Sequence, residues 1–142
     1  MVNKLLGEEK NKIAEAIQVA EQRTSGEIRV HVAKKCPDDV LSHAKKIFHR
    51  LRMHRTHQKN AVLIFVALES KKLAILGDNG IHEHVGEDYW QKTRDLMLKY
   101  FSKNEICEGI KAGVTSVGEK LRKHFPIGSH NPNELGNGVS EE

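Results

Sequence analysis

Hydrophobic and polar residues along the first third of the chain repeat with two different periods. Residues 8–23 carry apolar or small side chains at helical spacing, with charged side chains on the opposite face. After a break at residues 24–26, residues 27–33 alternate between β-branched and polar side chains, as expected for a strand with one buried face. Asp38 and Asp39 then suit the N-cap and first turn of a helix that extends to about residue 53.

The middle of the chain carries the strongest strand signal. Residues 60–68 form a continuous apolar run, which is typical of a central strand covered on both faces. A short polar connector separates this run from residues 72–76, so the second segment is expected to return antiparallel as a hairpin partner.

Two helical patterns follow the hairpin, at about residues 87–101 and 105–123. The first pattern is expected to bury large side chains on one stripe, among them Leu96 and Met97. The second pattern carries a stripe of aliphatic residues from Ile106 onward. Both helices are therefore predicted to pack against the sheet.

The order of the predicted elements defines an α/β fold class. A strand, a crossover helix and a second strand form a parallel, right-handed unit, and the hairpin adds one antiparallel strand. Helices must cover both faces of so apolar a sheet, which gives a three-layer α/β/α sandwich around a small mixed sheet. This domain is predicted over residues 1–126. Beyond it the composition turns to Gly, Asn, Pro and Ser, so residues 127–142 are predicted to be a flexible tail.

Composition narrows the class of protein. A chain of 142 residues with 30% charged and 38% hydrophobic residues fits one soluble globular domain. No apolar run approaches the roughly 20 residues needed to span a bilayer, and the first ten residues hold no apolar signal segment. We therefore expect a cytoplasmic protein without membrane insertion. The cysteines Cys36 and Cys107 match no metal spacing and are interpreted as free thiols in a reducing compartment.

The net charge of +4 raises the question of an anionic partner. Basic residues peak in residues 43–55, where apolar positions recur at helical spacing. This pattern favours an amphipathic helix with a solvated basic face over a binding surface. No aromatic residues that could stack on bases are interleaved with these charges, so nucleic acid is disfavoured as a partner.

The candidate chemistry lies where the hairpin strand ends, at residues 77–80 (Gly-Asp-Asn-Gly). Such a turn can hold positive φ angles while it directs a carboxylate and a carbonyl at one point. The hairpin strand must end at the edge where the first two strands begin, so this turn is expected near Glu27 and Asn60. Calcium takes about 6–8 oxygen ligands. The candidate ligands are the acidic residues that this edge gathers: Asp78, Asp88, Glu83, Glu87 and Glu27.

Other interpretations of these patterns stay open. The turn can be a solvated strand-to-helix connection without a ligand. At the opposite edge, Asp38 and Asp39 are interpreted mainly as helix-capping residues, and only secondarily as an acidic site. Zinc is a weaker alternative, because the sequence fixes no third ligand for two histidine groups. These groups are His82 with His84, and His49, His54 and His57.

Several blocks of this sequence resemble the TPM domain family. The blocks are Glu21-x-x-Thr24-Ser25-Gly26-Glu27-Ile28, Asn60-Ala61-Val62-Leu63-Ile64 and Ile75-Leu76-Gly77-Asp78-Asn79-Gly80-Ile81. Glu108-Gly109-Ile110 and Asn133-Glu134-Leu135 also resemble its short, stand-alone bacterial forms. The resemblance implies an α/β/α sandwich and divalent-cation binding, typically calcium, near the loop after the hairpin strand. The matching positions are Asp78 and, with weaker correspondence, Glu83 and Asp88.

The resemblance also bears on activity. Thylakoid members of the family are linked to photosystem repair and to acid phosphatase activity, and many other members are anchored in membranes or exported. We therefore expect a module that binds calcium or magnesium and presents its loops to a protein partner, without catalysis. The alternative is a metal-assisted phosphomonoesterase, with Asp78 as metal ligand and Asp88 as general base.

Overall fold

A computed structural model describes residues 5–36, 38–56, 58–127 and 138–142 of the chain. Its described elements alternate helix and strand through the first half and are mainly helical in the second. In chain order they are α1 (Gly7–Glu21), β1 (Glu27–Ala33), α2 (Val40–Arg50), the 3-10 helix η1 (Met53–Arg55), β2 (Ala61–Ala67), β3 (Lys72–Gly77), α3 (Asn79–Val85), the 3-10 helix η2 (Glu87–Trp90), α4 (Gln91–Ser102), α5 (Ile106–His124) and β4 (Ser140–Glu141).

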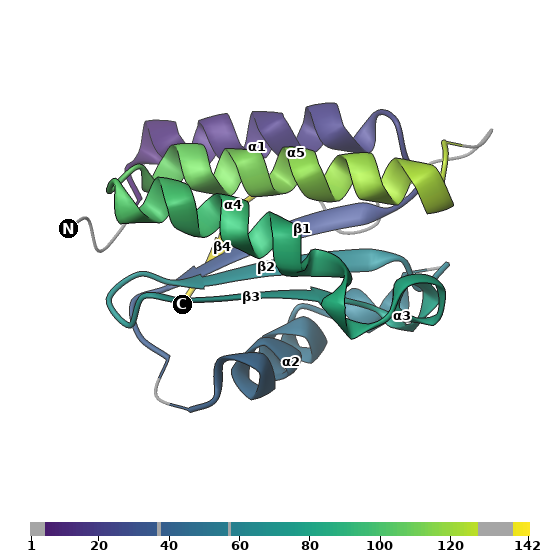
Figure 1. Ribbon diagram of the computed structural model, residues 1–142, viewed down its shortest axis with the longest axis horizontal. Helices are drawn as coiled ribbons and strands as arrows, with labels where there is room; N and C mark the ends of the chain where they lie inside the picture. Colours follow the sequence, from purple (N-terminus) through teal and green to yellow (C-terminus); the bar gives the residue numbers. More distant parts are fainter. Residues whose placement is uncertain (1–4, 37, 57, 128–137) are drawn as a thin grey trace.

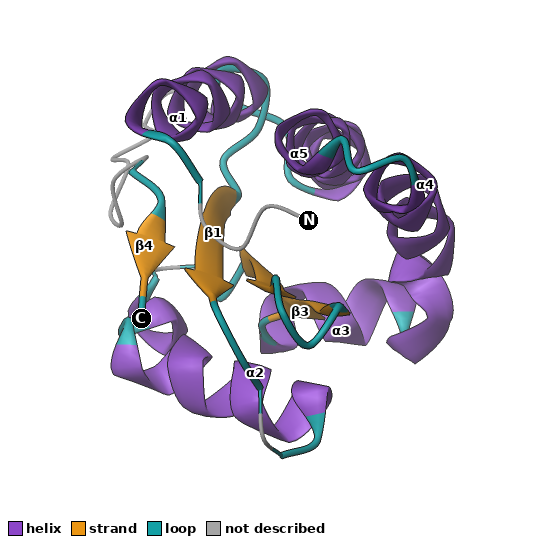
Figure 2. Cartoon of the chain, turned by 90° about the vertical axis from the view of Figure 1, so that its left-hand side faces the viewer, coloured by secondary structure: helices purple, strands orange, loops and turns teal. Residues whose placement is uncertain are grey.

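The described strands form a mixed sheet in the order β3-β2-β1-β4. β1 and β2 are parallel, β3 returns antiparallel to β2, and β4 lies parallel to β1 on the other side. Helices α1, α4 and α5 cover one face of the sheet, and α2 covers the other (Figure 1). The same layers are seen end-on in Figure 2. The predicted α/β fold class is confirmed.

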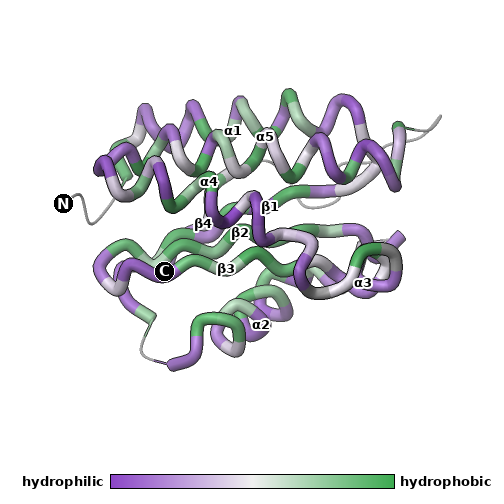
Figure 3. Tube along the Cα trace, viewed as in Figure 1, coloured by the Kyte–Doolittle hydropathy of each residue, from purple (hydrophilic) through white to green (hydrophobic). Residues whose placement is uncertain are grey.

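Alternation along the strands divides the core in two. Ile28, Val30 and Val32 of β1 pack into a cluster with α1 and α5, together with Val62, Ile64 and Val66 of β2. The intervening residues of β2 pack against α2 instead: Ala61, Leu63, Phe65 and Ala67. Every residue of β2 is buried, as its continuous apolar run predicted. Figure 3 shows mostly apolar residues along the strands and a mixture of polar and apolar residues along the helices.

Residues 140–141 pair with β1 as a short edge strand, which the sequence analysis did not anticipate. Ser140 lies opposite His31, and the backbone N–H of Glu142 donates to the carbonyl of Val32 at 3.2 Å. The side chain of Lys10 on α1 also forms an ion pair with Glu141. The flexible tail was predicted over residues 127–142; residues 128–137 of it lie outside the described residues, whereas its last residues belong to the sheet.

Two further differences concern the helices. The predicted helix ending near residue 53 stops at Arg50, because Arg52 adopts a left-handed conformation with φ of 59°. Leu96 was predicted to lie in the core, but it is 38% exposed, whereas Met97 beside it is fully buried. No helix among the described residues is long and apolar enough to cross a membrane.

Candidate functional site

Two carboxylates flank the first residue of β2. Glu27 lies opposite Ala61 in the parallel pair, and its backbone N–H donates to the carbonyl of Asn60 at 3.4 Å. On the other side, the backbone N–H of Asp78 donates to the carbonyl of Ala61 at 3.0 Å, one step beyond the Val62–Gly77 pair. The predicted meeting of these segments at one edge of the sheet is therefore present.

Glu27 and Asp78 also share a face of the sheet. Residues directly opposite each other in neighbouring strands project to the same side, and Ala61 projects toward α2. Since strands are spaced by about 4.8 Å, the Cα atoms of Glu27 and Asp78 are about 9.6 Å apart. Between them in this row stands only the methyl group of Ala61, so the two longer side chains can approach one shared ligand.

Both carboxylates at this edge of the sheet are buried. Glu27 is 3% exposed and Asp78 is 8% exposed. Asp78 Oδ1 accepts a hydrogen bond from the N–H of Asn79 at 2.8 Å, but Oδ2 is buried without a hydrogen-bond partner. Buried oxygen atoms without donors are costly, and a hard cation that prefers oxygen ligands would satisfy such atoms.

Arg29 is a positively charged residue on the same face of the sheet. It follows Glu27 by two residues in β1, so both side chains project toward α2. Its single positive charge stands against the two carboxylates of Glu27 and Asp78.

A third carboxylate, Glu21, lies close to this edge but was not among the predicted ligands. Its Oε2 accepts a hydrogen bond from the backbone N–H of Ile28 at 2.8 Å. Burial raises the pKa of Glu21 from 4.5 to about 7; the hydrogen bond from Ile28 opposes this rise, and the charge of Glu27 adds to it. The signal was its position as the last residue of α1, three residues before the Thr24-Ser25-Gly26 break that leads into β1.

Asn60 supports the edge from the opposite face. The alternation along β2 directs its side chain away from Ala61, and its amide Nδ2 donates to Ser25 Oγ at 3.4 Å. Asn60 is 2% exposed. The Asn60 side chain thus fixes the start of β2 against the segment before β1, and it does not join Glu27 and Asp78.

The Gly-Asp-Asn-Gly segment is the start of a helix. Asp78 is the N-cap of α3, and neither Gly77 nor Gly80 has the positive φ that we expected; Gly86, after α3, does, at 77°. Gly80 is instead required by close approach, because a Cβ there would lie 2.4 Å from the carbonyl oxygen of Gln58. This glycine lets α3 pack directly against the loop that leads into β2.

The other predicted ligands lie elsewhere. Glu83 is exposed on α3, and Asp88 is exposed in η2. The side chain of Glu87 is outside the described residues. From the predicted set, the structure places Glu27 and Asp78 on either side of Ala61, and it places Asp88 in a separate groove.

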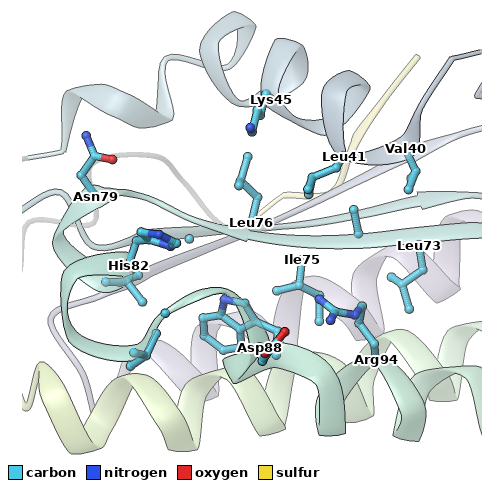
Figure 4. A pocket seen from close by; sticks show the side chains of 16 residues that line it. Val40, Leu41, Lys45, Leu73, Ile75, Leu76, Asn79, His82, Asp88 and Arg94 are labelled. Atoms are coloured by element: carbon cyan, nitrogen blue, oxygen red, sulfur yellow. The ribbon is translucent and has the colours of Figure 1, made fainter.

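That groove runs along the free edge of β3 and has a volume of about 560 Å³. Figure 4 shows Leu41 and Lys45 of α2 on one side of it, and Asp88 and Arg94 on the other. Its floor is formed by β3, and Asp78 is not one of its lining residues. The groove and the carboxylate edge are thus separate features.

The opposite edge of the sheet holds a second group of possible metal ligands. Cys36, Asp38 and His43 place one ligand atom each within 4.8 Å of one another. Cys36 was interpreted as a free thiol, because the two cysteines of the chain match no metal spacing. A local feature of the sequence does point to this group. Asp39 caps α2 by accepting from the N–H of Ser42 at 3.0 Å, and this cap places His43 on the first turn of the helix.

The remaining histidines form no three-residue site among the described residues. The rings of His49 and His54 lie with centroids 4.8 Å apart, so one pair of the predicted group meets. His82 is exposed on α3. His57 and the side chain of His84 lie outside the described residues.

The fold agrees with the family relationship that the sequence blocks indicate. The chain belongs to the TPM domain family, whose model matches residues 2–120.

Two solved structures show how far this relationship extends. The NMR structure of BA42 protein from the psychrophilic bacterium Bizionia argentinensis superposes with a TM-score of 0.91 at 38% identity, covering 100% of this chain and 99% of that one. The N-terminal domain of a P. gingivalis protein, at 15% identity, shares the fold, with a TM-score of 0.68 over 89% of this chain and 83% of that one. No curated protein matches the chain.

Proposed function

We propose that this TPM domain is a non-enzymatic module that binds a divalent cation, calcium or magnesium, between Glu27 and Asp78. The observation that carries the proposal is Asp78 Oδ2, which is buried without a hydrogen-bond partner at the edge that Glu27 shares. A carboxylate kept in this position costs free energy unless a positive charge compensates it.

The oxygen chemistry of this edge suits a hard cation. Glu27 and Asp78 would supply charged ligands, and water could complete the coordination. Calcium accepts carboxylate, hydroxyl and carbonyl oxygens together with water. When bound, the ion would neutralise the carboxylates and fix the start of α3 relative to β1 and β2. The fixed edge would then be presented to a protein partner.

The phosphomonoesterase alternative needs Asp78 and Asp88 at one phosphate group. Asp88 lines the groove along β3, whereas Asp78 does not. Arg94 and Lys45 of that groove could attract a phosphate, but the carboxylate among its described lining residues, Asp88, is exposed. Phosphatase activity is therefore the weaker of the two proposals.

Calorimetric titration with calcium tests the proposed ligand set. We expect saturable binding to the wild type and at least tenfold weaker binding to Asp78→Asn and to Glu27→Gln. Asn remains a good N-cap residue, so Asp78→Asn removes the charge without removing the helix start. Glu83→Gln and Asp88→Asn are matched controls and should keep the wild-type affinity. Wild-type affinity in Asp78→Asn, or loss of binding in Asp88→Asn alone, would contradict the proposal.

A further inference from the structure

The loop between β1 and α2 assembles a sulfur, an oxygen and a nitrogen ligand at the edge of the sheet opposite to Glu27 and Asp78. Asp38 Oδ1 lies 3.3 Å from His43 Nδ1 and 3.9 Å from Cys36 Sγ. All three ligand atoms lie within 4.8 Å of one another. These residues come from two neighbouring elements, so the chain path itself sets their spacing.

The separations match those around a tetrahedral zinc ion. With the usual bond lengths to nitrogen, oxygen and sulfur, tetrahedral angles place the nitrogen and oxygen ligands about 3.3 Å apart, and the sulfur and oxygen ligands about 3.6 Å apart. The observed 3.3 and 3.9 Å differ from these values by a few tenths of an ångström at most. One ion could therefore contact all three residues after small side-chain adjustments.

The imidazole of His43 is already held in the orientation that a metal requires. Its Nε2 lies 2.8 Å from Glu142 Oε1, which leaves Nδ1 directed at Asp38. Its ring also packs against Phe65, with centroids 5.2 Å apart. Metal-bound histidines commonly donate their second ring N–H to a carboxylate, which fixes the tautomer and the ring position. Here Glu142 is the carboxylate that would accept the N–H of His43 Nε2.

Two lysines lie nearby, but they contact other atoms of this loop than the proposed ligand atoms. Lys46 contacts the other carboxylate oxygen of Asp38, with 3.2 Å between Nζ and Oδ2. Lys72 donates to the backbone carbonyls of Cys36 and Asp38 at 3.3 Å, which does not occupy the thiol. The Asp38 side chain is 37% exposed and provides a path from solvent, whereas Cys36 is only 3% exposed.

We propose that Cys36, Asp38 and His43 form a binding site for zinc, or for a divalent transition metal of similar preference, with Glu142 as the positioning residue for His43. A thiolate and an imidazole distinguish this site chemically from the oxygen site at Glu27 and Asp78, because calcium and magnesium avoid sulfur. Three protein ligands leave the fourth position to water or to an exogenous ligand.

The position of Glu142, which holds His43, depends on strand β4. Glu142 directly follows the two residues of this strand, and β4 ends beside α2, as seen in Figure 2. Arg50 of α2 lies 3.4 Å from Glu142 Oε2 and holds the same side chain. Metal binding at His43 should therefore stabilise the pairing of β4 with β1. We expect slower amide exchange at Glu142 when zinc is bound.

Cobalt(II) is the spectroscopic probe for this site. We expect the full-length wild type to bind one equivalent and to show a near-ultraviolet absorption from thiolate-to-cobalt charge transfer. Cys36→Ser should lose this absorption and bind zinc at least tenfold more weakly. Cys107→Ser is the matched control, since Cys107 is also a buried free thiol, and it should keep both properties. Glu142→Gln should keep the absorption but weaken zinc binding by about 10- to 100-fold.

Three results would overturn the proposal. The first is wild-type protein without thiolate-to-cobalt absorption, a measurement that does not depend on any variant folding correctly. The second is zinc affinity unchanged by Cys36→Ser. The third is binding abolished by His49→Gln but retained in His43→Gln, which would place the metal at the pair formed by His49 and His54. Asp78→Asn should leave zinc binding unchanged, so failure at one edge is distinguishable from failure at the other.

Discussion

The backbone N–H of Ile28 donates a hydrogen bond to Glu21 Oε2 at 2.8 Å and ties the end of α1 to the second residue of β1. Glu21 is 7% exposed, and Glu27 lies close enough to raise its pKa further. A neutral carboxyl group still accepts the hydrogen bond through its carbonyl oxygen. The acidic edge is thus linked to helix α1 through a carboxyl group that burial favours in its protonated form.

The first prediction concerns stability against pH. The pKa of Glu21 rises from 4.5 to about 7 on folding, so the folded state holds this proton more tightly than the unfolded state. Its contribution is fully present below pH 4.5 and is lost as the pH rises toward and through 7. The loss amounts to about 3 kcal/mol. We expect Glu21→Gln, whose amide oxygen can accept the same hydrogen bond, to be more stable than the wild type at pH 8.

Urea unfolding of metal-free protein at pH 4, 6 and 8 measures this effect. Wild type and Glu21→Gln should differ little at pH 4 and progressively more at higher pH. Glu15→Gln, an exposed position on the same helix, should follow the wild type at every pH. A constant difference between wild type and Glu21→Gln across the range would exclude a buried, titrating Glu21.

The second prediction concerns the contact between α3 and the loop before β2. A Cβ at position 80 would meet the carbonyl oxygens of Gln58 at 2.4 Å and Lys59 at 2.5 Å. Both neighbours are backbone atoms, so the loop or the helix must move. We expect Gly80→Ala to lower the free energy of unfolding by about 1–3 kcal/mol.

Denaturant unfolding of Gly80→Ala, compared with Gly7→Ala, checks this prediction. A Cβ at position 7 would meet no atom within 4 Å, so alanine there should be neutral or slightly stabilising. Equal stability of Gly80→Ala and the wild type would show that α3 does not pack on this loop.

The third prediction compares two adjacent residues of α4. Met97 is fully buried and packs so closely on Gly113 of α5 that a Cβ there would lie 2.4 Å from its sulfur. Leu96 is 38% exposed. Met97→Ala should lower the free energy of unfolding by about 2–5 kcal/mol. Leu96→Ala should change it by less than about 1 kcal/mol. Denaturant unfolding measures both, and similar losses in the two variants would contradict this orientation of α4.

Hydrophobic periodicity predicted the architecture because burial dictates it directly. The alternating residues 27–33 and the apolar run at 60–68 became β1 and β2, within a residue at each end. The direction of the hairpin then placed Asp78 beside the start of β2. That inference needed only the antiparallel return of β3 and no knowledge of side-chain contacts.

The elements that were not predicted depend on contacts that the local sequence does not encode. β4 is short and polar, and it forms because β1 has a free edge and because Glu142 meets His43 and Arg50. Helix α3 was missed because Asp78 was interpreted as a turn residue, although aspartate is also a preferred N-cap. Leu96 and Met97 were both predicted to be buried, but adjacent residues of a helix point in different directions, and it is Met97 that packs against Gly113 of α5.

The candidate sites were likewise only partly predictable from the sequence. Glu27 and Asp78 could be paired from strand order alone, whereas Glu21 required the path of α1 into β1. Asp88 was grouped with Asp78 by closeness in sequence, but α3 and η2 carry it to the groove along β3. Cys36 and His43 meet because the loop after β1 and the first turn of α2 fold toward each other, which residue spacing did not reveal.

An amide NMR titration with calcium, on the wild type and on Asp78→Asn, tests the proposed calcium site directly. We expect saturable chemical-shift changes centred on Glu27, on residues 58–61 and on residues 77–80. These changes should be strongly reduced in Asp78→Asn, while Glu83→Gln should reproduce the wild-type pattern. Shifts centred on residues 36–43, or no saturable change at millimolar calcium, would contradict a calcium site between Glu27 and Asp78.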